Sequence, residues 1–448
     1  RGLGDVYKRQ GVFGSAVAGF ALVPLLGVQA SVIAVSALNT CIGIALILFD
    51  PATARRARIV TVAGSGGLFL VLGAFFLREG ALDLTSYTER IDSAEVLSYE
   101  EGIGATVKVF RDHYGDKLLS INGFPVAGTP LGLHDAQKPL AHLPLLLSPV
   151  PSPKVNLIGF GAGGASWGVL QYDVERVDCV ELVPAVPNAA EWFPEINHGV
   201  LSEPRFNLIM GDGRNYALVA EEKYDVISID ATSPKMAGNG ALYSLEFYQL
   251  LRERLTEQGL AVQWIPFHLL SEAEVRMTTR TFIEVFPHTT LWLTALRQHA
   301  ILVGTQEELE IDFTALSQKI EDIRVQRDLE SLKVTDVIDF LGWFVMGEAA
   351  LKEYAGDAPL NTDNHPYLEF TPAMAYFVAD RYRVENLRDM RDSRESVLPL
   401  LTNLGATEEE GAAVAERVQK RFESTQHSLL GDMMLSLGRR DEAIVEYN

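Results

Sequence analysis

Cysteine is scarce in this sequence, and the histidines form no cluster. The 448 residues include only two cysteines, Cys41 and Cys179, and both lie inside apolar runs. This excludes a disulfide framework and a thiolate metal site. The nine histidines show none of the spacings typical of a metal-ligand set, so we expect no metal and assign no histidine to catalysis.

Basic side chains are also in the minority. Lysine and arginine total 38 against 59 aspartates and glutamates, which gives a formal net charge of -21. Nucleic-acid affinity is built largely from clusters of lysine and arginine, so we expect no nucleic-acid partner. The acidic balance is better suited to a cationic small molecule. Hydrophobic residues nevertheless make up 48% of the chain, which indicates that apolar and charged residues are segregated along it.

The longest uncharged runs lie in the N-terminal 80 residues. Residues 11–49 carry no charge and are long enough for two spanning helices with a break near 24–29, and a second uncharged run covers 59–77. We therefore expect about three transmembrane helices in residues 1–80, in contact with lipid, and a multi-pass protein of the bacterial inner membrane. Small residues at four-residue spacing would let such helices approach closely: Gly11, Ser15 and Gly19.

The connection between the two runs, residues 50–58, carries Arg55, Arg56 and Arg58. A short basic loop normally stays in the cytoplasm, which by itself would place everything after residue 77 on the other side of the membrane. The membrane side of the soluble part is left open at this stage. The chain begins without methionine, so we expect a fragment, and residues 1–10 are left out of the fold reasoning.

The pattern changes after the apolar runs. Strand-like stretches separated by glycines predict a small β unit within residues 81–150, with strands at 96–99, 105–110 and 117–121. Strands then alternate with helices over 151–310. The expected strands are 155–158, 176–182, 206–210, 224–229 and 260–264, and the expected helices include 165–170 and 245–255. The alternation predicts an α/β fold with a doubly wound, Rossmann-like (S-adenosylmethionine-methyltransferase-like) parallel sheet, whose ligands bind beyond the carboxyl ends of the strands.

A glycine-rich loop follows the first of these strands. Its sequence is Gly159-Phe-Gly161-Ala-Gly163-Gly164, and a helix is expected to begin directly after it. Glycines at this place permit a tight turn and a close approach of the backbone to a nucleotide. Glu181 ends the second strand about 20 residues later, where a carboxylate can accept hydrogen bonds from ribose hydroxyls. The pair predicts a nucleoside site.

Acids also follow the next two strands. Gly211-Asp212-Gly213-Arg214 comes after the third strand, and Asp230 ends the fourth. Glu181, Asp212 and Asp230 are therefore expected to project into one crevice. Three carboxylates would repel a pyrophosphate and hold a sulfonium or an ammonium. Each aspartate also has an ordinary alternative as a turn or helix-cap residue.

These residues resemble the spermidine synthase (polyamine aminopropyltransferase) family, and specifically its membrane-fused bacterial type, the transporter-like/spermidine synthase fusions. The similarity covers about residues 96–303, and the segment 359–370 resembles one that recurs in the fusions. The motifs that carry it are the glycine loop at 159–164, Glu181, the GDGR at Gly211, Asp230 with Pro234, the segment 242–248, Gln263, and the stretches 119–123 and 140–147.

The resemblance implies an aminopropyltransferase whose cosubstrate is decarboxylated S-adenosylmethionine, with no permanently bound cofactor. Gly159, Gly161 and Gly163 would hold its methionine part and ribose. Glu181 would bind the ribose, while Asp212 and Gly213 would lie on the adenine side. Asp230 would be the base that acts on the amine acceptor, and the residues lining the acceptor side would be Ser233, Tyr243 and Gln263.

The chain departs from the family pattern at three places. Ala162 stands where the glycine loop usually carries an aspartate, Ser233 replaces a second aspartate after the fourth strand, and the glutamine and acidic-aromatic residues of the amine channel are not evident in residues 124–138. Putrescine as the acceptor loses support. Two alternatives stay open: an S-adenosylmethionine-dependent methyltransferase, and a non-catalytic ligand-binding module on a membrane bundle.

The remaining sequence predicts helices. Residues 311–425 are rich in charged residues and leucine at helical spacing, for example over 316–329, and predict a helical extension. Residues 426–448 resemble the start of a tetratricopeptide repeat. One such unit cannot bury its apolar face alone, so we expect further repeats in the intact protein and a protein partner that binds them. A homo-oligomer is also possible on this reading.

Overall fold

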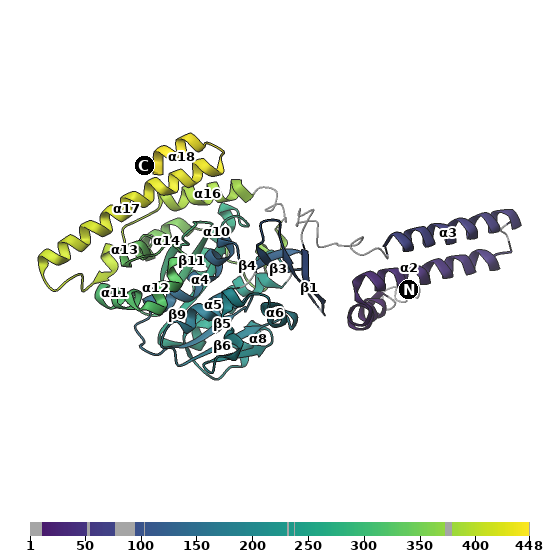
Figure 1. The fold of residues 1–448 in the computed structure, drawn as a ribbon, viewed down its shortest axis with the longest axis horizontal. Helices are drawn as coiled ribbons and strands as arrows, with labels where there is room; N and C mark the ends of the chain where they lie inside the picture. Colours follow the sequence, from purple (N-terminus) through teal and green to yellow (C-terminus); the bar gives the residue numbers. More distant parts are fainter. Residues whose placement is uncertain are drawn as a thin grey trace. The chain divides into compact units, whose positions relative to one another are not determined.

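The computed structural model describes residues 11–51, 54–76, 95–102, 104–230, 233–236, 238–371 and 379–447. It divides into two compact units, Arg1–Pro125 and Val126–Asn448, and each is described by itself. The expected fragment start at residues 1–10 lies outside the described residues. Figure 1 gives the element labels used below.

The N-terminal unit begins with apolar helices. An apolar helix over Gly11–Leu22, which ends in the π-helix η1 (Ala18–Leu22), runs into α2 (Val23–Phe49), and α3 (Arg55–Phe76) lies alongside α2 (Figure 1). Gly27 inside α2 has φ 79° and ψ 165°, so the backbone breaks within the predicted 24–29 interval. The predicted break is confirmed.

Two of the described helices are long and apolar enough to span a membrane, where the sequence predicted three. They are Ala30–Phe49 and Arg55–Ala74, whereas Gly11–Leu22 is shorter. The break at Gly27 is the reason, because the described residues before it are too few for the roughly 20 that a span needs. The basic loop also differs from expectation, since Arg55, Arg56 and Arg58 belong to the first turns of α3.

A four-stranded sheet follows the apolar helices along the chain, and its last strand continues past the unit boundary at Pro125. Its order is β1-β2-β3-β4, with bounds Glu95–Glu101, Thr106–Arg111, Lys117–Ile121 and Phe124–Gly128. The three predicted strands are confirmed as β1 to β3. The edge strand β4 was not predicted because Pro125 argues against a strand, although proline is tolerated at an edge. Asn122 and Gly123 both have positive φ, which is the geometry of a tight hairpin turn between β3 and β4.

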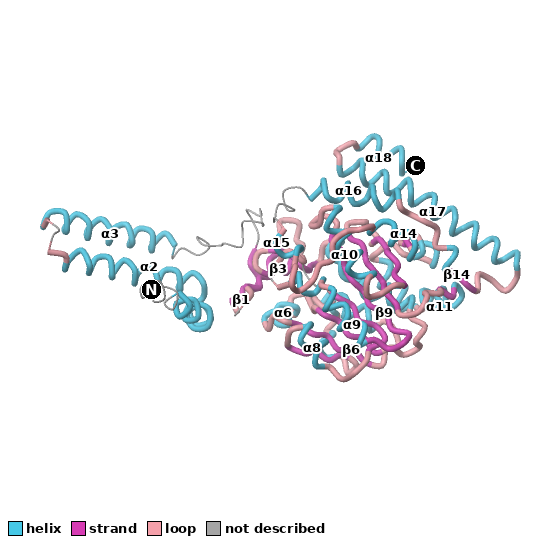
Figure 2. Tube along the Cα trace, turned by 180° about the vertical axis from the view of Figure 1, so that it is seen from behind, coloured by secondary structure: helices cyan, strands magenta, loops and turns pink. Residues whose placement is uncertain are grey.

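The second unit is built on an eight-stranded sheet of order β13-β10-β11-β9-β8-β5-β6-β7 (Figure 2). The five predicted strands are confirmed, and all five run parallel. They are β5 (Lys154–Ile158), β6 (Arg176–Glu181), β7 (Phe206–Met210), β8 (Tyr224–Ile229) and β9 (Leu255–Pro266). The order reverses at β5, as in a doubly wound sheet, so a crevice is expected where β5 and β8 end.

The sheet is mixed, which corrects the expectation of a purely parallel one. β10 (His288–Leu293), β11 (His299–Thr305) and β13 (Phe344–Met346) extend it beyond β9 in antiparallel fashion. Only five residues separate β10 from β11, and so short a connection permits a hairpin but no parallel crossover. β13 comes from the region predicted to be helical, so the extension is part of the sheet.

Helices cover both faces of this sheet. Side chains of Ile227 and Ile229 on β8 belong to a core that includes Phe247 of α9 (Leu245–Arg254) and Phe282 of α10 (Glu272–Ile283). The intervening Ser228 donates a hydrogen bond to the Leu140 carbonyl on the opposite face. Leu140 lies in α4 (Leu131–Leu147), which also contacts α5 (Gly164–Leu170).

Several helices of the extension pack around the antiparallel edge. The predicted helix over 316–329 is interrupted by Asp322, whose carboxylate accepts from the Arg324 N–H at 2.9 Å and starts a new helix. The helices are α11 (Phe313–Glu321), α12 (Ile323–Glu330), α13 (Val337–Leu341), α14 (Glu348–Ala355), α15 (Tyr367–Phe370), α16 (Ala379–Asp392), α17 (Glu408–Ser436) and α18 (Arg440–Tyr447). α17 is continuous across residue 425, and it pairs closely with α18. The repeat-like reading of residues 426–448 remains a prediction.

A buried ionic network joins α4 to α12. Asp328 lies 2.6 Å from Lys138 Nζ and 2.8 Å from His142 Nε2, and His142 Nδ1 contacts the Tyr172 hydroxyl at 2.9 Å. Burial acts to raise the pKa of Asp328, but the hydrogen bonds and charges of His142 and Lys138 outweigh it, so the pKa is well below its ordinary value. The carboxylate is therefore the partner shared by the Lys138 ammonium and the His142 ring.

We expect Asp328→Asn to lower the free energy of unfolding by about 3 kcal/mol, because it leaves the Lys138 ammonium without a buried counter-charge. The depressed pKa means that this stabilisation is present above about pH 4 and is lost as the pH falls below that. Urea denaturation at pH 7 measures the effect. Asp173→Asn is the control, because Asp173 pairs with Arg324 at an exposed site, and it should change stability by less than about 0.5 kcal/mol. Equal effects of the two substitutions would contradict this assignment.

Candidate functional site

The glycine loop crosses directly beneath the end of β8. Gly159 has φ 104°, and a Cβ built on it would lie 2.3 Å from the Asp230 carbonyl oxygen. Gly161 and Gly163 have φ values of 55° and 84°. All three predicted glycines therefore adopt backbone conformations that side chains disfavour, and Gly159 has no space for one.

Glu181 fixes the loop to the end of β6. Its carboxylate accepts a hydrogen bond from the Phe160 N–H at 3.0 Å and another from the Val183 N–H at 2.7 Å. Burial raises the pKa of this carboxyl, and the hydrogen bonds from the backbone act in the opposite direction. The structure thus places Glu181 against the glycine loop, as the sequence predicted.

Asp230 ends β8 beside this loop. Its N–H donates to the Ile158 carbonyl at 2.9 Å, which holds the two strand ends together. Burial raises the pKa of its carboxyl to about 7, and the negative charge of Glu181 adds to the rise. No hydrogen bond from a described residue reaches the Asp230 carboxylate. The structure therefore brings two of the three predicted acids into one electrostatically coupled pair.

Asp212 stands in a different environment. It is exposed and caps α8 (Gly213–Val219), with its carboxylate accepting from the Asn215 N–H at 2.8 Å. The helix-cap alternative named above is thus what the structure displays for this residue. Gly213 begins the same helix, and a Cβ there would lie 2.4 Å from Ile158 Cγ2, so the helix starts directly against β5.

The residues predicted for the acceptor side differ in how closely they lie to Asp230. Burial raises the pKa of the Tyr243 hydroxyl, with the charge of Asp230 as the next cause, and this hydroxyl donates to the Trp264 carbonyl at 3.2 Å. Gln263 is fully buried and bonds to the Tyr248 hydroxyl at 3.2 Å. Ser233 is buried in a turn and accepts from the Lys235 N–H at 3.3 Å. Of these three residues, Tyr243 is the one whose pKa the charge of Asp230 helps to raise.

The sequence analysis missed Gln137. This side chain of α4 is 4% exposed, and its Nε2 would lie 2.7 Å from a Cβ built on Gly161. It therefore covers the glycine loop from the side of α4. No motif marks it in the sequence, because it lies on a helix that is distant from the loop along the chain and is brought over the loop only by the folding of the sheet.

The segment 359–370 packs against the loop that precedes α9. Asn361 donates to the Tyr243 carbonyl at 3.0 Å and accepts, through its own carbonyl, from the Leu245 N–H at 2.9 Å. Asp363 pairs with both terminal nitrogens of Arg214, one of them at 2.7 Å to Oδ1. The late motif is thereby bonded to the GDGR motif and to the acceptor-side tyrosine.

Among the described residues there is no group of three or more histidines, cysteines or acids arranged to hold a metal ion. The site that these residues form is instead a loop of tightly packed backbone with two coupled carboxyls. Such a site has the groups to bind a nucleoside and a cation.

Comparison with known proteins supports the resemblance seen in the sequence. Residues 134–306 match the spermine/spermidine synthase domain. The polyamine aminopropyltransferase of Korarchaeum cryptofilum is 41% identical over 121 residues, which cover 27% of this chain and 37% of that protein. The polyamine aminopropyltransferase of Thermococcus kodakarensis is 36% identical over 163 residues, covering 35% and 56% of the two chains.

The similarity does not extend over whole proteins. Polyamine aminopropyltransferase 1 of Streptomyces coelicolor is 28% identical over 248 residues, which cover 53% of this chain and 46% of the relative. The chain thus spans about half the length of the curated relatives that it matches. The crystal structure of spermidine synthase from Thermotoga maritima has a TM-score of 0.47 at 22% identity, covering 58% of this chain and 87% of that one.

Within the GDG motif, we expect alanine to be tolerated at one glycine and rejected at the other. Gly213→Ala brings a methyl group against the stiff side chain of Ile158 and should destabilise the fold by about 1–3 kcal/mol. Gly211→Ala, the matched control, meets no atom within 4 Å and should change stability by less than about 0.5 kcal/mol. Urea denaturation of both variants distinguishes them, and a Gly213→Ala protein as stable as the unsubstituted one would refute the close packing of α8 on β5.

Proposed function

Since residues 134–306 match the spermine/spermidine synthase domain, we propose that this chain is an aminopropyltransferase that uses decarboxylated S-adenosylmethionine and an amine acceptor. The observation that carries the proposal is the pair of neighbouring carboxyls, Glu181 and Asp230, beside a glycine loop in which Gly159 has no space for a side chain. The domain match covers neither the N-terminal helices nor the extension.

The nucleoside would lie along the glycine loop. The backbone can approach it closely at Gly159, Gly161 and Gly163. The Glu181 carboxylate would accept hydrogen bonds from the ribose hydroxyls, through the lone pairs that its bonds to backbone N–H groups leave free. The sulfonium would lie near Glu181 and Asp230, whose negative charges favour a cation in a partly buried site. Asp212 and Gly213 would face the adenine, with Asp212 retaining its cap.

Asp230 would be the base. An alkylammonium has a pKa near 10 and no free electron pair, so it must lose a proton before it can attack. The amine nitrogen then bonds to the carbon beside sulfur while the C–S bond breaks. The electron pair stays on sulfur, and the products are the aminopropylated amine and methylthioadenosine. The released proton passes to Asp230, whose pKa of about 7 allows it to accept the proton and return it to solvent near neutral pH.

The acceptor would enter beside Tyr243, which is coupled to Asp230 and bonded to the segment containing Asn361. Ser233 and Gln263 are both buried and hydrogen-bonded within the protein, so they would shape this side of the site rather than supply charge. With Ala162 and Ser233 where the family pattern carries aspartates, fewer charged contacts remain for a diamine. We infer an amine acceptor other than putrescine.

We expect the detergent-solubilised chain to release methylthioadenosine when it is given decarboxylated S-adenosylmethionine and a panel of amines. Asp230→Asn should lower turnover by about 10²–10⁴-fold with little change in methylthioadenosine affinity, because it removes the base and keeps the shape. Asp173→Asn is the matched control, because Asp173 is exposed and has no role in the proposed site, and it should retain full activity. Release of S-adenosylhomocysteine from S-adenosylmethionine would establish a methyltransferase instead, and nucleoside binding without either product would indicate a binding module.

The pKa of Asp230 predicts the pH dependence of this reaction. Below pH 7 the carboxyl is protonated and cannot accept a proton, so kcat/KM should rise about tenfold per pH unit up to about pH 7. Steady-state rates between pH 5 and 8 measure the profile. A kcat/KM that stays nearly constant from pH 5 to pH 8 would show that Asp230 keeps an ordinary pKa and would remove the burial argument.

We also propose that α2 and α3 attach the protein to a membrane. Both carry many exposed apolar side chains, for example Leu46 at 67%, Val60 at 71% and Leu70 at 71%. Exposed apolar surface of this extent marks a contact with lipid or protein. The chain should therefore remain in the pellet after alkaline carbonate extraction, while a chain without residues 11–76 should appear in the supernatant. Full release of the unshortened chain would contradict membrane attachment.

A further inference from the structure

A cavity of about 380 Å³ lies between the β10–β11 loop and the helices of the extension. Its wall includes the loop residues 293–298, Trp343, and side chains from α16, α17 and α18. None of the glycine-loop residues and neither of the coupled carboxyls, Glu181 and Asp230, line it. It is therefore a separate site that the proposed transferase reaction does not use.

The cavity is positively charged although the whole chain carries a net charge of -21. Four cationic side chains line it against a single carboxylate, that of Asp432; the cations are Arg297, Lys333, Arg383 and Arg421. Arg297 pairs with Asp432 at 2.7 Å, and Arg421 pairs with Asp339 at 3.2 Å. The described residues supply no carboxylate partner for Arg383 or Lys333.

Two guanidinium groups of the wall have unused donors. The Nε atoms of Arg383 and Arg421 are buried, and no described acceptor reaches either of them. The remaining contacts of Arg383 are with two uncharged groups, the Ser436 hydroxyl at 3.1 Å and the Leu296 carbonyl at 3.4 Å. Buried donors without acceptors cost free energy, so both groups would gain from an anion in the cavity.

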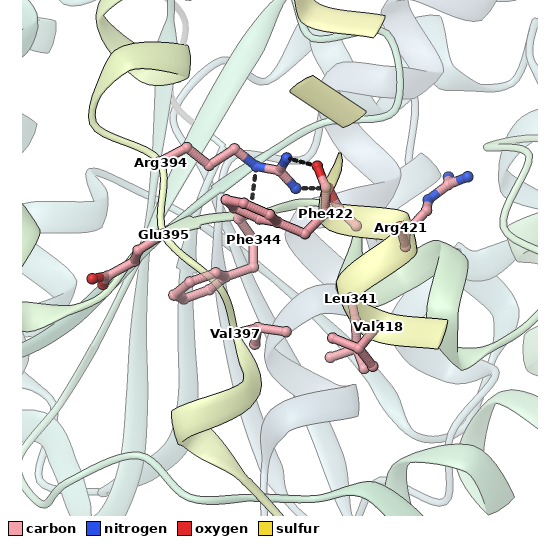
Figure 3. A pocket seen from close by; sticks show the side chains of 9 residues that line it. Leu341, Phe344, Arg394, Glu395, Val397, Val418, Arg421 and Phe422 are labelled. Atoms are coloured by element: carbon pink, nitrogen blue, oxygen red, sulfur yellow. Dashed lines mark hydrogen bonds between the residues drawn. The ribbon is translucent and has the colours of Figure 1, made fainter. Parts of the chain in front are cut away.

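Neighbouring groups respond to the excess of positive charge. Arg394 lines a second, smaller pocket that shares Gly342 and Arg421 with the cavity, and it donates to the Phe422 carbonyl at 2.6 Å (Figure 3). Burial lowers its pKa to about 9, and the charges of Arg297 and Arg421 contribute to the fall. Burial also lowers the pKa of His299, with the charge of Arg383 among the further causes. Both groups thus experience positive charge from the arginines of the cavity, although Asp432, Asp339 and Asp135 lie nearby.

We propose that this cavity binds the phosphate monoester of a small molecule. Guanidinium groups present planar, paired donors that match phosphate oxygens, and arginine is preferred where such anions are recognised. A volume of about 380 Å³ is within the range of small-molecule sites and leaves room for more than the phosphate itself. The largely buried indole of Trp343 provides an apolar wall for the remainder of the ligand.

Calorimetry on the full chain in detergent tests this proposal with two matched pairs, uridine monophosphate against uridine and glucose 6-phosphate against glucose. Adenosyl compounds are avoided because they are expected at the glycine loop. Each phosphorylated probe should bind at least tenfold more tightly than its partner, and the difference should shrink at high salt. Vesicles that contain phosphatidic acid, compared with phosphatidylcholine vesicles, show whether the monoester can come from a lipid.

Arg383→Gln should weaken binding of the phosphorylated probe at least tenfold. Its matched control is Arg381→Gln, on the same helix, where the side chain is 73% exposed and pairs with Glu385, and this variant should bind as the unsubstituted chain does. If Arg383→Gln fails to fold, Lys333→Asn replaces it. Lys333 is exposed and has a φ of 57°, a backbone conformation that asparagine tolerates. This variant should bind the phosphorylated probe at least threefold more weakly. The proposal is overturned if the chain binds phosphorylated and unphosphorylated probes equally and also binds both vesicle types equally. It is likewise overturned if the folded variant binds the phosphorylated probe as tightly as the unsubstituted chain does.

Discussion

The site depends on the close approach of two backbone segments, the loop after β5 and the residue that follows β8, at the carboxyl ends of these central strands. Gly159 passes so near to the Asp230 carbonyl oxygen that a Cβ would lie 2.3 Å away, and the Asp230 N–H is bonded to Ile158. The loop after β5 and the end of β8 are therefore fixed relative to each other. Glu181 holds the loop from the other side, so the two carboxyls are brought together by backbone geometry rather than by a contact between their side chains.

Helix α4 connects this crossing to the remainder of the unit. Over residues 135–142, this helix presents Gln137 to the glycine loop, Asp135 to the β10–β11 loop, and Lys138 with His142 to Asp328 of the extension. Burial raises the pKa of Asp135 to about 6 even though the Thr294 hydroxyl and backbone N–H groups bond to it. One buried helix thus supports the glycine loop, the β10–β11 hairpin and the extension, which explains why its polar residues are buried.

Charge is separated between two places in the unit. The strand ends carry coupled carboxyls that suit a cation, whereas the cavity in the extension carries arginines that suit an anion. The negative net charge of the chain agrees with the acidic strand ends but gives no sign of the cationic cavity. The cationic residues of the cavity are spread over residues 297–421 and come together only on folding. An overall acidic sequence is therefore compatible with a local site for a phosphate.

The sequence alone determined the parallel strands, the break near Gly27, the glycine loop and the acid at the end of β6, because strand alternation, glycine spacing and motif order are local properties of the chain. It could not determine that Asp212 caps a helix away from the coupled pair, that Gln137 covers the loop, or that the extension contributes a strand. These features depend on contacts between residues far apart in the chain, and only tertiary packing decides which side chains meet and which lose their water.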